Sequence, residues 1–203
     1  MRVVPFTQPG HLPPAIVAVR AALASHTVTA VPTETYYGLA VAPDDSVAVA
    51  RLVALKGRPT EKALPVVGAS LAQLETLVQF VEPWRERLFE VWPAPLTVVL
   101  PVASRVRGSG TLGVRVPAHG LLRGLLAEVG PLTATSANRS GAPPLDDAAA
   151  VSRSLGEDLA VLLDGGRTPG GVPTTVLDLC ARPPRMLRVG AFVPPAVWHV
   201  EGP

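Results

Sequence analysis

The sequence predicts an α+β protein in which helices pack on one mixed, twisted sheet. Short β-branched strands alternate with amphipathic helices along the 203 residues, as in layered folds. Several connections between strands are too short for a parallel crossover, so antiparallel pairs are expected beside parallel ones. Hydrophobic residues make up 48% of the chain, enough for a sizeable core. We expect a single domain over residues 1–203, with its core at about 12–192 and a proline-rich surface tail at 193–203.

Helices are expected where capping residues precede apolar residues at helical spacing. Proline is tolerated in a first turn, so the pair at 13–14 begins the first helix. The run Lys56-Gly57-Arg58-Pro59 is a typical helix stop, with a cation, a glycine and a proline in order. In chain order the helices are expected from Pro13 to about Ser25, from Asp44–Ser46 to Lys56, from Ser70 to about Phe80, from Pro83 to Trp92, from about Gly120 to Val129, and after Asp146 or Asp147.

Strands are expected where β-branched and apolar residues run together for a few positions. Pro32 is expected to force the chain out of the first strand, and Gly38 to let the loop after it turn. Cys180 is expected to be a small core residue, and Leu187 to Gly190 to close the core. The expected strands are Val28 to Val31, Leu64 to Val67, Val98 to Leu100, Thr111 to Val116, Pro131 to Ala134, Ala160 to Leu163 and Val176 to Leu179.

Composition limits the function classes. The formal charge of +2 is too small to argue for broad nucleic-acid binding, although a pI of about 9.1 is compatible with an anionic ligand. Cys180 is the only cysteine, which excludes an internal disulfide and a multi-cysteine metal site. No apolar run is as long as a membrane span, and Met1 to Gly10 lacks the pattern of a secretion signal. A soluble, cytoplasmic protein is therefore expected.

Three turns rich in Ser, Thr and Asn lie at the ends of predicted strands: 33–35 and 135–138 follow a strand, and 174–175 precedes one. Hydroxyl and amide groups, together with the backbone N–H groups of irregular turns, form concave sites for anions. The cations that could converge on these turns are Lys56, Arg58, Arg115 and Arg188. Only two of the 18 basic residues are lysines, and both lie within 56–62. A compact ammonium at Lys56 can therefore be functional as well as a helix stop.

Common nucleotide and nucleophile motifs are absent from the sequence. There is neither a G-x-x-x-x-G-K-[ST] loop nor a strand-linked G-x-G-x-x-G, so a nucleotide is expected to be bound in another way. Ser136 lies in T-S-A-N rather than in G-x-S-x-G, which argues against a nucleophilic serine. We expect His119 to cap the following helix rather than to contact a ligand, and we predict no metal-ligating residues.

Six motifs in order give the chain a resemblance to a known family. They are P-T-E-T-x-Y-G-L at 32–39, K-x-R-P at 56–59, P-x-P-L-T at 93–97, R-x-P at 115–117, S-x-N-x-S-G at 136–141 and a terminal L-R at 187–188. Each motif alone is weak, but their order is specific. The chain resembles the YrdC-like threonylcarbamoyl-AMP synthases over about Leu12 to Phe192.

The resemblance implies a large twisted sheet around a positively charged central cavity. It implies an enzyme that converts L-threonine, bicarbonate or CO2, and ATP into L-threonylcarbamoyladenylate and pyrophosphate, with Mg2+ on the phosphates. Partner transferases would use this product to build N6-threonylcarbamoyladenosine in tRNA. By the same resemblance the threonine site would contain Thr33, Arg115 and Thr174. The ATP site would contain Lys56, Arg58, Thr111, Ala134, Ser136, Asn138 and Arg188, of which Lys56 and Arg58 are the candidate catalytic residues.

The sequence departs from the family pattern at several positions. Tyr36 stands where the family has a small apolar residue, and Ala63 stands where it often has a proline. Ala94 replaces a glycine, and Thr174 replaces a serine. Val189 follows Arg188 where the family usually has a proline. The length resembles the short bacterial form. Two alternatives stay open at this point: an RNA-binding module, and a relative of the carbamoyl-adenylate-forming domain of hydrogenase-maturation carbamoyltransferases.

Overall fold

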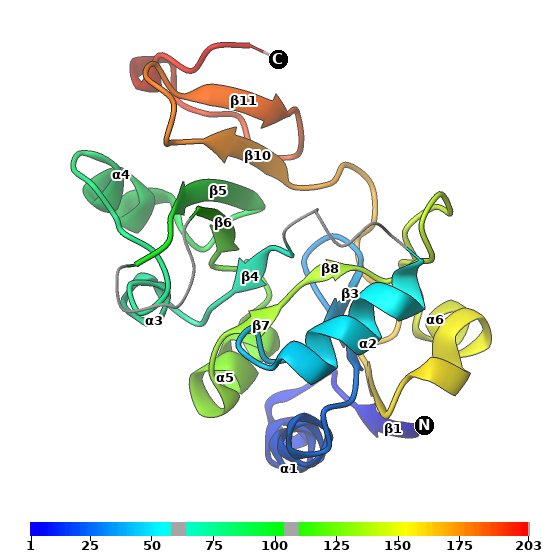
Figure 1. Ribbon diagram of the computed structural model, residues 1–203. Helices are drawn as coiled ribbons and strands as arrows, with labels where there is room; N and C mark the ends of the chain where they lie inside the picture. The colour runs from blue at the N-terminus through cyan, green and yellow to red at the C-terminus, as the bar shows by residue number, and fades with distance from the viewer. Residues whose placement is uncertain (58–63, 104–109, 203) are drawn as a thin grey trace.

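The computed structural model describes residues 1–57, 64–103 and 110–202, and in these ranges two mixed β-sheets carry the helices (Figure 1). In the view of Figure 1, strands β10 (Thr175–Asp178) and β11 (Arg185–Arg188) lie at the top with the C-terminus, and β1 (Arg2–Pro5) and α1 (Leu12–Ala24) lie at the bottom. The expected mixture of parallel and antiparallel strands is confirmed, but the single sheet is wrong, because the pairing falls into two sheets.

The first sheet has five strands and combines both pairing directions. Its first three strands are parallel neighbours, and the last two add antiparallel pairs. In spatial order the strands are β1 (Arg2–Pro5), β9 (Val161–Asp164), β2 (Thr29–Pro32), β3 (Tyr37–Ala40) and β8 (Thr135–Ser136).

The second sheet has six strands and alternates antiparallel with parallel pairs. In spatial order the strands are β11 (Arg185–Arg188), β10 (Thr175–Asp178), β5 (Leu96–Pro101), β6 (Thr111–Arg115), β4 (Val66–Val67) and β7 (Leu132–Thr133).

The two sheets are joined through Ala134. β7 pairs with β4 in the second sheet, and β8, which begins one residue after Ala134, pairs with β3 in the first. The Ala134 N–H donates to Pro65 O (2.8 Å), so the linking residue keeps its backbone bond. The predicted strand Pro131 to Ala134 is thus divided between two sheets, which brings the second hydroxyl-rich turn to their junction.

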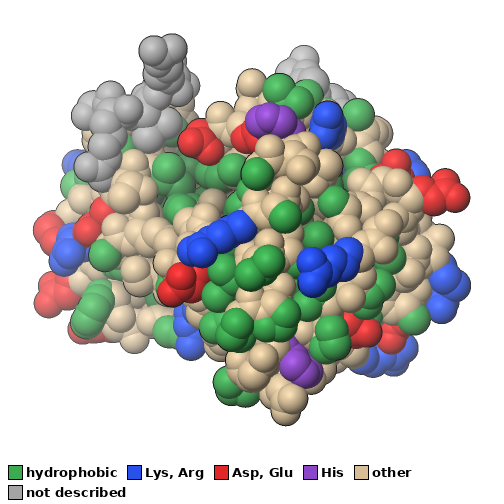
Figure 2. All heavy atoms as spheres, turned by 90° about the horizontal axis from the view of Figure 1, so that it is seen from below, with side chains coloured by type: hydrophobic (Ala, Val, Ile, Leu, Met, Phe, Trp, Pro, Cys, Tyr) green, Lys and Arg blue, Asp and Glu red, His purple; other side chains and the backbone are tan. Residues whose placement is uncertain are grey.

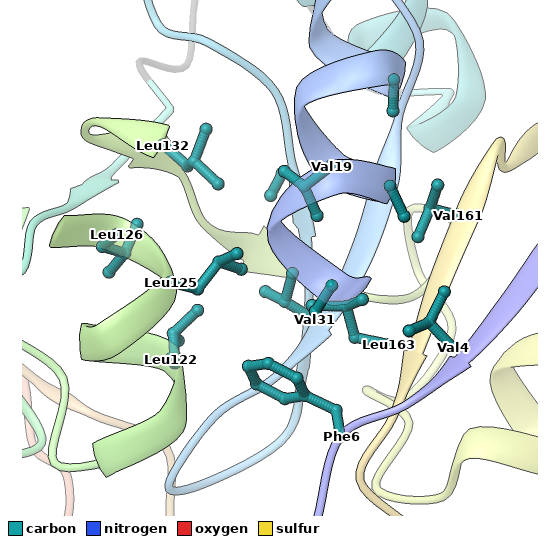
Figure 3. Packing of buried hydrophobic residues seen from close by; sticks show 14 of the residues in the cluster. Val4, Phe6, Val19, Val31, Leu122, Leu125, Leu126, Leu132, Val161 and Leu163 are labelled. Atoms are coloured by element: carbon teal, nitrogen blue, oxygen red, sulfur yellow. The ribbon is translucent and has the colours of Figure 1, made fainter. Parts of the chain in front are cut away.

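Helices cover the first sheet on both faces. Figure 3 shows Phe6, Val31 and Leu122 lying together where α1 and α5 pack on one face. Ala30 and Leu39 face the opposite way and pack with α2 and α6. This alternation is the period-2 pattern of a strand buried on both sides. The helices are α1 (Leu12–Ala24), α2 (Ser46–Lys56), α5 (Gly120–Val129) and α6 (Ala148–Leu155), with short 3-10 turns at η1 (Pro9–His11) and η2 (Gly156–Asp158).

The second sheet packs against α3 (Leu71–Leu74), α4 (Trp84–Val91) and the C-terminal segment. Leu88 and Trp92 are buried here, four positions apart and on one face of the α4 region. The 3-10 turn η3 (Ala196–Trp198) places Trp198 edge-on against Trp84, with ring centroids 5.4 Å apart. Trp198 is buried, so the expectation of a surface tail is wrong for this residue.

Several local predictions need correction. Pro32 stays in the ladder as the last residue of β2 and pairs with Tyr37, and Gly38 lies in strand β3 rather than in a turn. The helix after Ser70 ends at Leu74 instead of Phe80, because the chain turns to form a bridge between Val78 and Val102.

The C-terminal strands also differ from the prediction. Cys180 follows β10 and is exposed, so it is not a core residue. Leu187 and Val189 are exposed too and do not close the core, because β11 is the edge strand of its sheet. At the other end of the chain, Val4 of β1 is buried although no strand was predicted there.

Candidate active site

A cavity of about 720 Å³ lies where the two sheets meet. The first sheet contributes residues of β3 and β8, and the second contributes residues of five of its strands. The lining residues that carry hydroxyl or guanidinium groups are Thr33, Thr35, Tyr36, Tyr37, Thr97, Thr111, Arg115, Thr135, Ser136, Thr174 and Arg188. All three hydroxyl-rich turns predicted from the sequence therefore reach one cavity.

The first turn, residues 33–36, is held by its own hydroxyl groups. Thr33 Oγ1 donates to Tyr36 O (2.7 Å) and accepts from Thr35 N (3.1 Å). Thr33 is 3% exposed. Because its proton is already given to a backbone carbonyl, Thr33 Oγ1 can only accept from a ligand, and the ligand would take the place of the Thr35 hydroxyl, which lies 3.3 Å away.

The buried Arg115 lies on β6 beside this turn. Its Nη1 donates to Oε1 of Glu34, and both side chains are mostly shielded from solvent, at 8% and 12% exposure. Burial lowers the pKa of Arg115, while the charge and the hydrogen bond of Glu34 oppose that shift. A buried guanidinium with a partner on one side is suited to bind a carboxylate or phosphate on another.

The third turn is held from behind by β11. Arg188 Nε donates to Thr174 O (2.9 Å), and its Nη2 donates to Thr174 Oγ1 (2.8 Å). The Thr97 hydroxyl lies 3.4 Å from that of Thr174. Burial lowers the pKa of Arg188, and repulsion from Arg115 lowers it further, so the two cations act on each other.

Gly190 allows β11 to approach this turn. A Cβ at this position would lie 2.3 Å from Thr175 N and 2.4 Å from Pro173 O, closer than any side chain can pack. The Ala191 N–H donates to Pro173 O (2.9 Å) from the same stretch. Only glycine therefore fits where the segment after β11 crosses the third turn.

The second turn is organised around Lys56. Its Nζ donates to Ser136 O (2.6 Å), Asn138 O (3.0 Å) and Asn138 Oδ1 (2.9 Å), and Ser136 Oγ donates to the same Oδ1 (2.6 Å). The helix-stop interpretation of Lys56 is also confirmed, because α2 ends there and Gly57 is left-handed (φ 59°). The same residue thus ends a helix and holds the turn.

The predicted site residues fall into three groups. Seven line the cavity: Thr33, Thr111, Arg115, Ala134, Ser136, Thr174 and Arg188. Lys56 and Asn138 lie behind Ser136 and do not line it. Arg58 lies outside the described residues.

His119 is a helix cap, as predicted. Its Nδ1 accepts from Leu122 N (3.1 Å) at the start of α5, and its ring stacks on Phe6 with centroids 6.2 Å apart. Burial lowers its pKa, which favours the neutral ring that can accept this bond.

Sequence reasoning placed Glu34 in the first turn but gave it no role, and it missed Thr97 and Tyr36 as parts of the site. Glu34 stands between two threonines that were singled out, but its partner Arg115 is 81 positions away, and pairing at that distance has no sequence signal. Thr97 was seen only as part of the P-x-P-L-T motif. The Tyr36 hydroxyl donates to Gly171 O and joins the first turn to the loop before the third.

Two negative findings apply to the described residues. Within them, no three His, Cys, Asp or Glu side chains gather in a way that could hold a metal ion. Nor does any helix in these ranges have the length and apolar character needed to cross a membrane.

A family model for Sua5, YciO and YrdC proteins, described as "Telomere recombination", matches residues 21–190. The chain belongs to the Sua5/YciO/YrdC family. Threonylcarbamoyl-AMP synthase of Vibrio cholerae is 40% identical over 178 residues, covering 83% of this chain and 94% of the relative. The enzyme of that name from Pyrococcus abyssi is 41% identical over 172 residues, covering 81% of this chain and 51% of its own length. The chain thus spans nearly all of the first relative and about half of the second.

Three solved structures share the fold. P. abyssi Sua5 complexed with L-threonine has a TM-score of 0.84 and 34% identity, covering 94% of this chain and 58% of that one. E. coli YciO has a TM-score of 0.82 and 24% identity, and the match covers 94% of this chain and 95% of YciO. HypF in a phosphate- and nucleotide-bound form has a TM-score of 0.73 and 25% identity, and the match covers 86% of this chain and 29% of HypF. The mixed sheets with packed helices are therefore the architecture of the Sua5/YciO/YrdC family.

Proposed function

We propose that the protein is an L-threonylcarbamoyladenylate synthase that uses L-threonine, bicarbonate or CO2, and ATP. The observation that carries the proposal is that Thr33, Arg115, Ser136 and Thr174 line one cavity in a member of this family. Relatives that are 35–42% identical bear the name threonylcarbamoyl-AMP synthase, and P. abyssi Sua5 forms a complex with L-threonine.

Threonine would bind between the first and third turns. The Arg115 guanidinium would bind its carboxylate, since guanidinium and carboxylate form charge-assisted hydrogen bonds. Thr33 Oγ1 would accept from the amine, because its own proton goes to Tyr36 O. Thr174 Oγ1 accepts from Arg188, which leaves its proton free to donate to an anionic group of the substrate.

ATP would occupy the part of the cavity lined by Thr111, Ala134, Ser136 and Arg188. Arg188 supplies positive charge, and Ala134 supplies backbone groups at the junction of the sheets. Ser136 Oγ now donates to Asn138, so its hydroxyl has to rotate before it can donate to a phosphate. Lys56 holds this turn from behind, and we predict that Arg58 completes the phosphate contacts. The cavity would then be positively charged, since Arg115 and Arg188 are the charged residues among its described lining.

The reaction needs no protein nucleophile. The threonine amine adds to CO2 and loses a proton, which gives a carbamate. A carbamate oxygen then attacks the α-phosphorus of ATP, the bond between the α- and β-phosphates breaks, and pyrophosphate leaves with its electron pair. The cavity would accelerate both steps by holding the reactants together and neutralising phosphate charge.

We propose that Mg2+ enters with ATP as part of the substrate. Magnesium in such sites usually keeps several waters and is held largely by the substrate phosphates. This agrees with the scarcity of carboxylates at the cavity, where the nearby Glu34 is paired with Arg115. The product would pass to partner transferases that modify tRNA.

Two other functions make different predictions. The likeness to HypF favours a carbamoyl-adenylate-forming domain as the second candidate, which would use carbamoyl phosphate in place of threonine. An RNA-binding module would need a broad basic surface. On the face shown in Figure 2, acidic and basic side chains are interspersed, which gives such a module no support there.

The test is to incubate the purified protein with Mg-ATP, bicarbonate and L-threonine and to measure pyrophosphate. We expect release that requires both threonine and bicarbonate. Release that ignores threonine but requires carbamoyl phosphate would favour the HypF-like function. No nucleotide turnover, together with salt-sensitive RNA binding, would contradict the synthase and favour the RNA-binding module.

A further inference from the structure

The two carboxylate oxygens of Glu34 differ in their hydrogen bonding. Oε1 accepts from Arg115, whereas Oε2 is buried and has no hydrogen-bond partner among the described residues. A buried carboxylate oxygen without a partner is costly and is seldom retained without a role. Glu34 does not line the cavity, so it does not meet a ligand there directly.

Arg115 depends on Glu34 for its orientation. Among the described residues, the one hydrogen bond of the Arg115 side chain goes to Glu34. Arg188, which lines the same cavity, repels Arg115, and burial disfavours the guanidinium charge. The Glu34 carboxylate opposes both effects, and it holds Nη1 so that the rest of the planar guanidinium is free for a ligand.

The backbone around Glu34 is fixed at the same time. Thr33 and Thr35 on either side are buried, and the Thr35 carbonyl accepts from Gly170 N (2.7 Å). Glu34 therefore lies on a rigid turn. Arg115 lies on β6, an inner strand of the second sheet that is paired on both sides. The distance between the two groups is set by elements that do not need a ligand to form.

We propose that Glu34 is a positioning residue for substrate recognition, which fixes the direction and the charge of Arg115 so that this guanidinium can bind the carboxylate of the amino-acid substrate. The inference rests on the proposed function for the identity of that substrate. It makes Glu34 a determinant of threonine affinity without a contact to threonine.

The test is the variant Glu34→Gln, which keeps the length and one acceptor oxygen but removes the charge. We expect the KM for threonine to rise about tenfold or more, while the KM for ATP and kcat change less than about threefold. Glu34→Asp, which keeps the charge on a shorter side chain, should recover part of the affinity. Glu128→Gln, which removes an exposed ion pair with Arg20, is the matched control and should leave both KM values unchanged.

A double-mutant cycle separates positioning from general damage. If Glu34 acts through Arg115, adding Glu34→Gln to Arg115→Ala should weaken threonine binding little further. An additive loss would overturn the proposal, as would equal losses of threonine and ATP affinity in the single variant. Calorimetry with threonine alone reads the same affinities without turnover. A lack of pyrophosphate release by the wild-type protein would then count against the proposed function and not against the role of Glu34.

Discussion

Arg188 holds Thr174 through two hydrogen bonds, from Nε to the Thr174 carbonyl at 2.9 Å and from Nη2 to its hydroxyl at 2.8 Å. The contact connects the edge strand β11 to the third turn of the cavity. A residue assigned to ATP by family resemblance thus directly orients a residue assigned to threonine. The proposed threonine and ATP parts of the cavity are therefore in direct contact through this pair.

Arg188→Gln should therefore impair both substrates. The variant loses a charge from the cavity and frees the Thr174 hydroxyl. We expect the KM values for threonine and for ATP each to rise roughly tenfold, since a charged hydrogen bond contributes about 1.5–3 kcal/mol. Steady-state kinetics with each substrate varied in turn is the measurement. An effect on ATP alone would show that the contact with Thr174 does not matter for threonine.

Arg115→Ala and Lys56→Ala should have opposite selectivity. Arg115 lies beside the first turn, so its loss should weaken threonine more than ATP, by roughly tenfold or more. Lys56 holds the carbonyls of Ser136 and Asn138, so its loss should weaken ATP more. Lys56→Ala should also lower the free energy of unfolding by about 1–3 kcal/mol, because the partly buried contacts of its ammonium with Ser136 and Asn138 are lost. Equal effects on both substrates in the two variants would contradict this division of the site.

Gly190→Ala should disturb the third turn from a position outside the cavity lining, because the added Cβ meets Pro173 and Thr174, which line the cavity. The added Cβ meets backbone atoms of Thr175 and Pro173, which cannot rotate away. We expect a loss of about 1–3 kcal/mol in the free energy of unfolding and a higher KM for threonine. Gly120→Ala, where a Cβ would meet nothing within 4 Å, is the control and should stay within about 0.5 kcal/mol. If denaturant unfolding gave the same free energy of unfolding for both variants, it would contradict the close approach of Gly190 to the third turn.

His119 should make stability fall at mildly acidic pH. Burial holds its folded-state pKa below the ordinary histidine value of about 6.5, so the unfolded chain binds the proton more readily. The stabilisation is complete above about pH 6.5 and is lost as the pH falls through the folded-state pKa. His119→Asn keeps a capping acceptor that does not titrate. Its free energy of unfolding should depend less steeply on pH below 6.5 than that of the wild type, and parallel curves would exclude His119 as the cause.

The sequence predicted the helices well because their signals are local. Asp45 accepts from Val47 N and Ala48 N as the cap of α2, and Asp147 caps α6 in the same way. Both caps depend on residues within three positions of the helix start. The short strands were harder to predict from sequence. β1 has four residues, and its partner β9 lies far from it in the sequence, at Val161–Asp164.

Seven of the predicted site residues line the cavity, but the contacts that bring them together were not predicted. The three turns reach one cavity because β7 and β8 part at Ala134, and this division follows from pairing with β4 and β3 rather than from local residues. The pair of Glu34 and Arg115 likewise exists only after β6 and the first turn are brought together. Residue type indicated which groups could bind an anion, and tertiary structure decided which of them meet.

The most direct test of the central claim is a crystal structure with L-threonine and a non-hydrolysable ATP analogue. The account predicts both ligands in the one cavity, with the threonine carboxylate about 3 Å from the Arg115 guanidinium and the phosphates beside Ser136 and Arg188. Threonine bound away from Arg115, or a nucleotide bound outside this cavity, would contradict it.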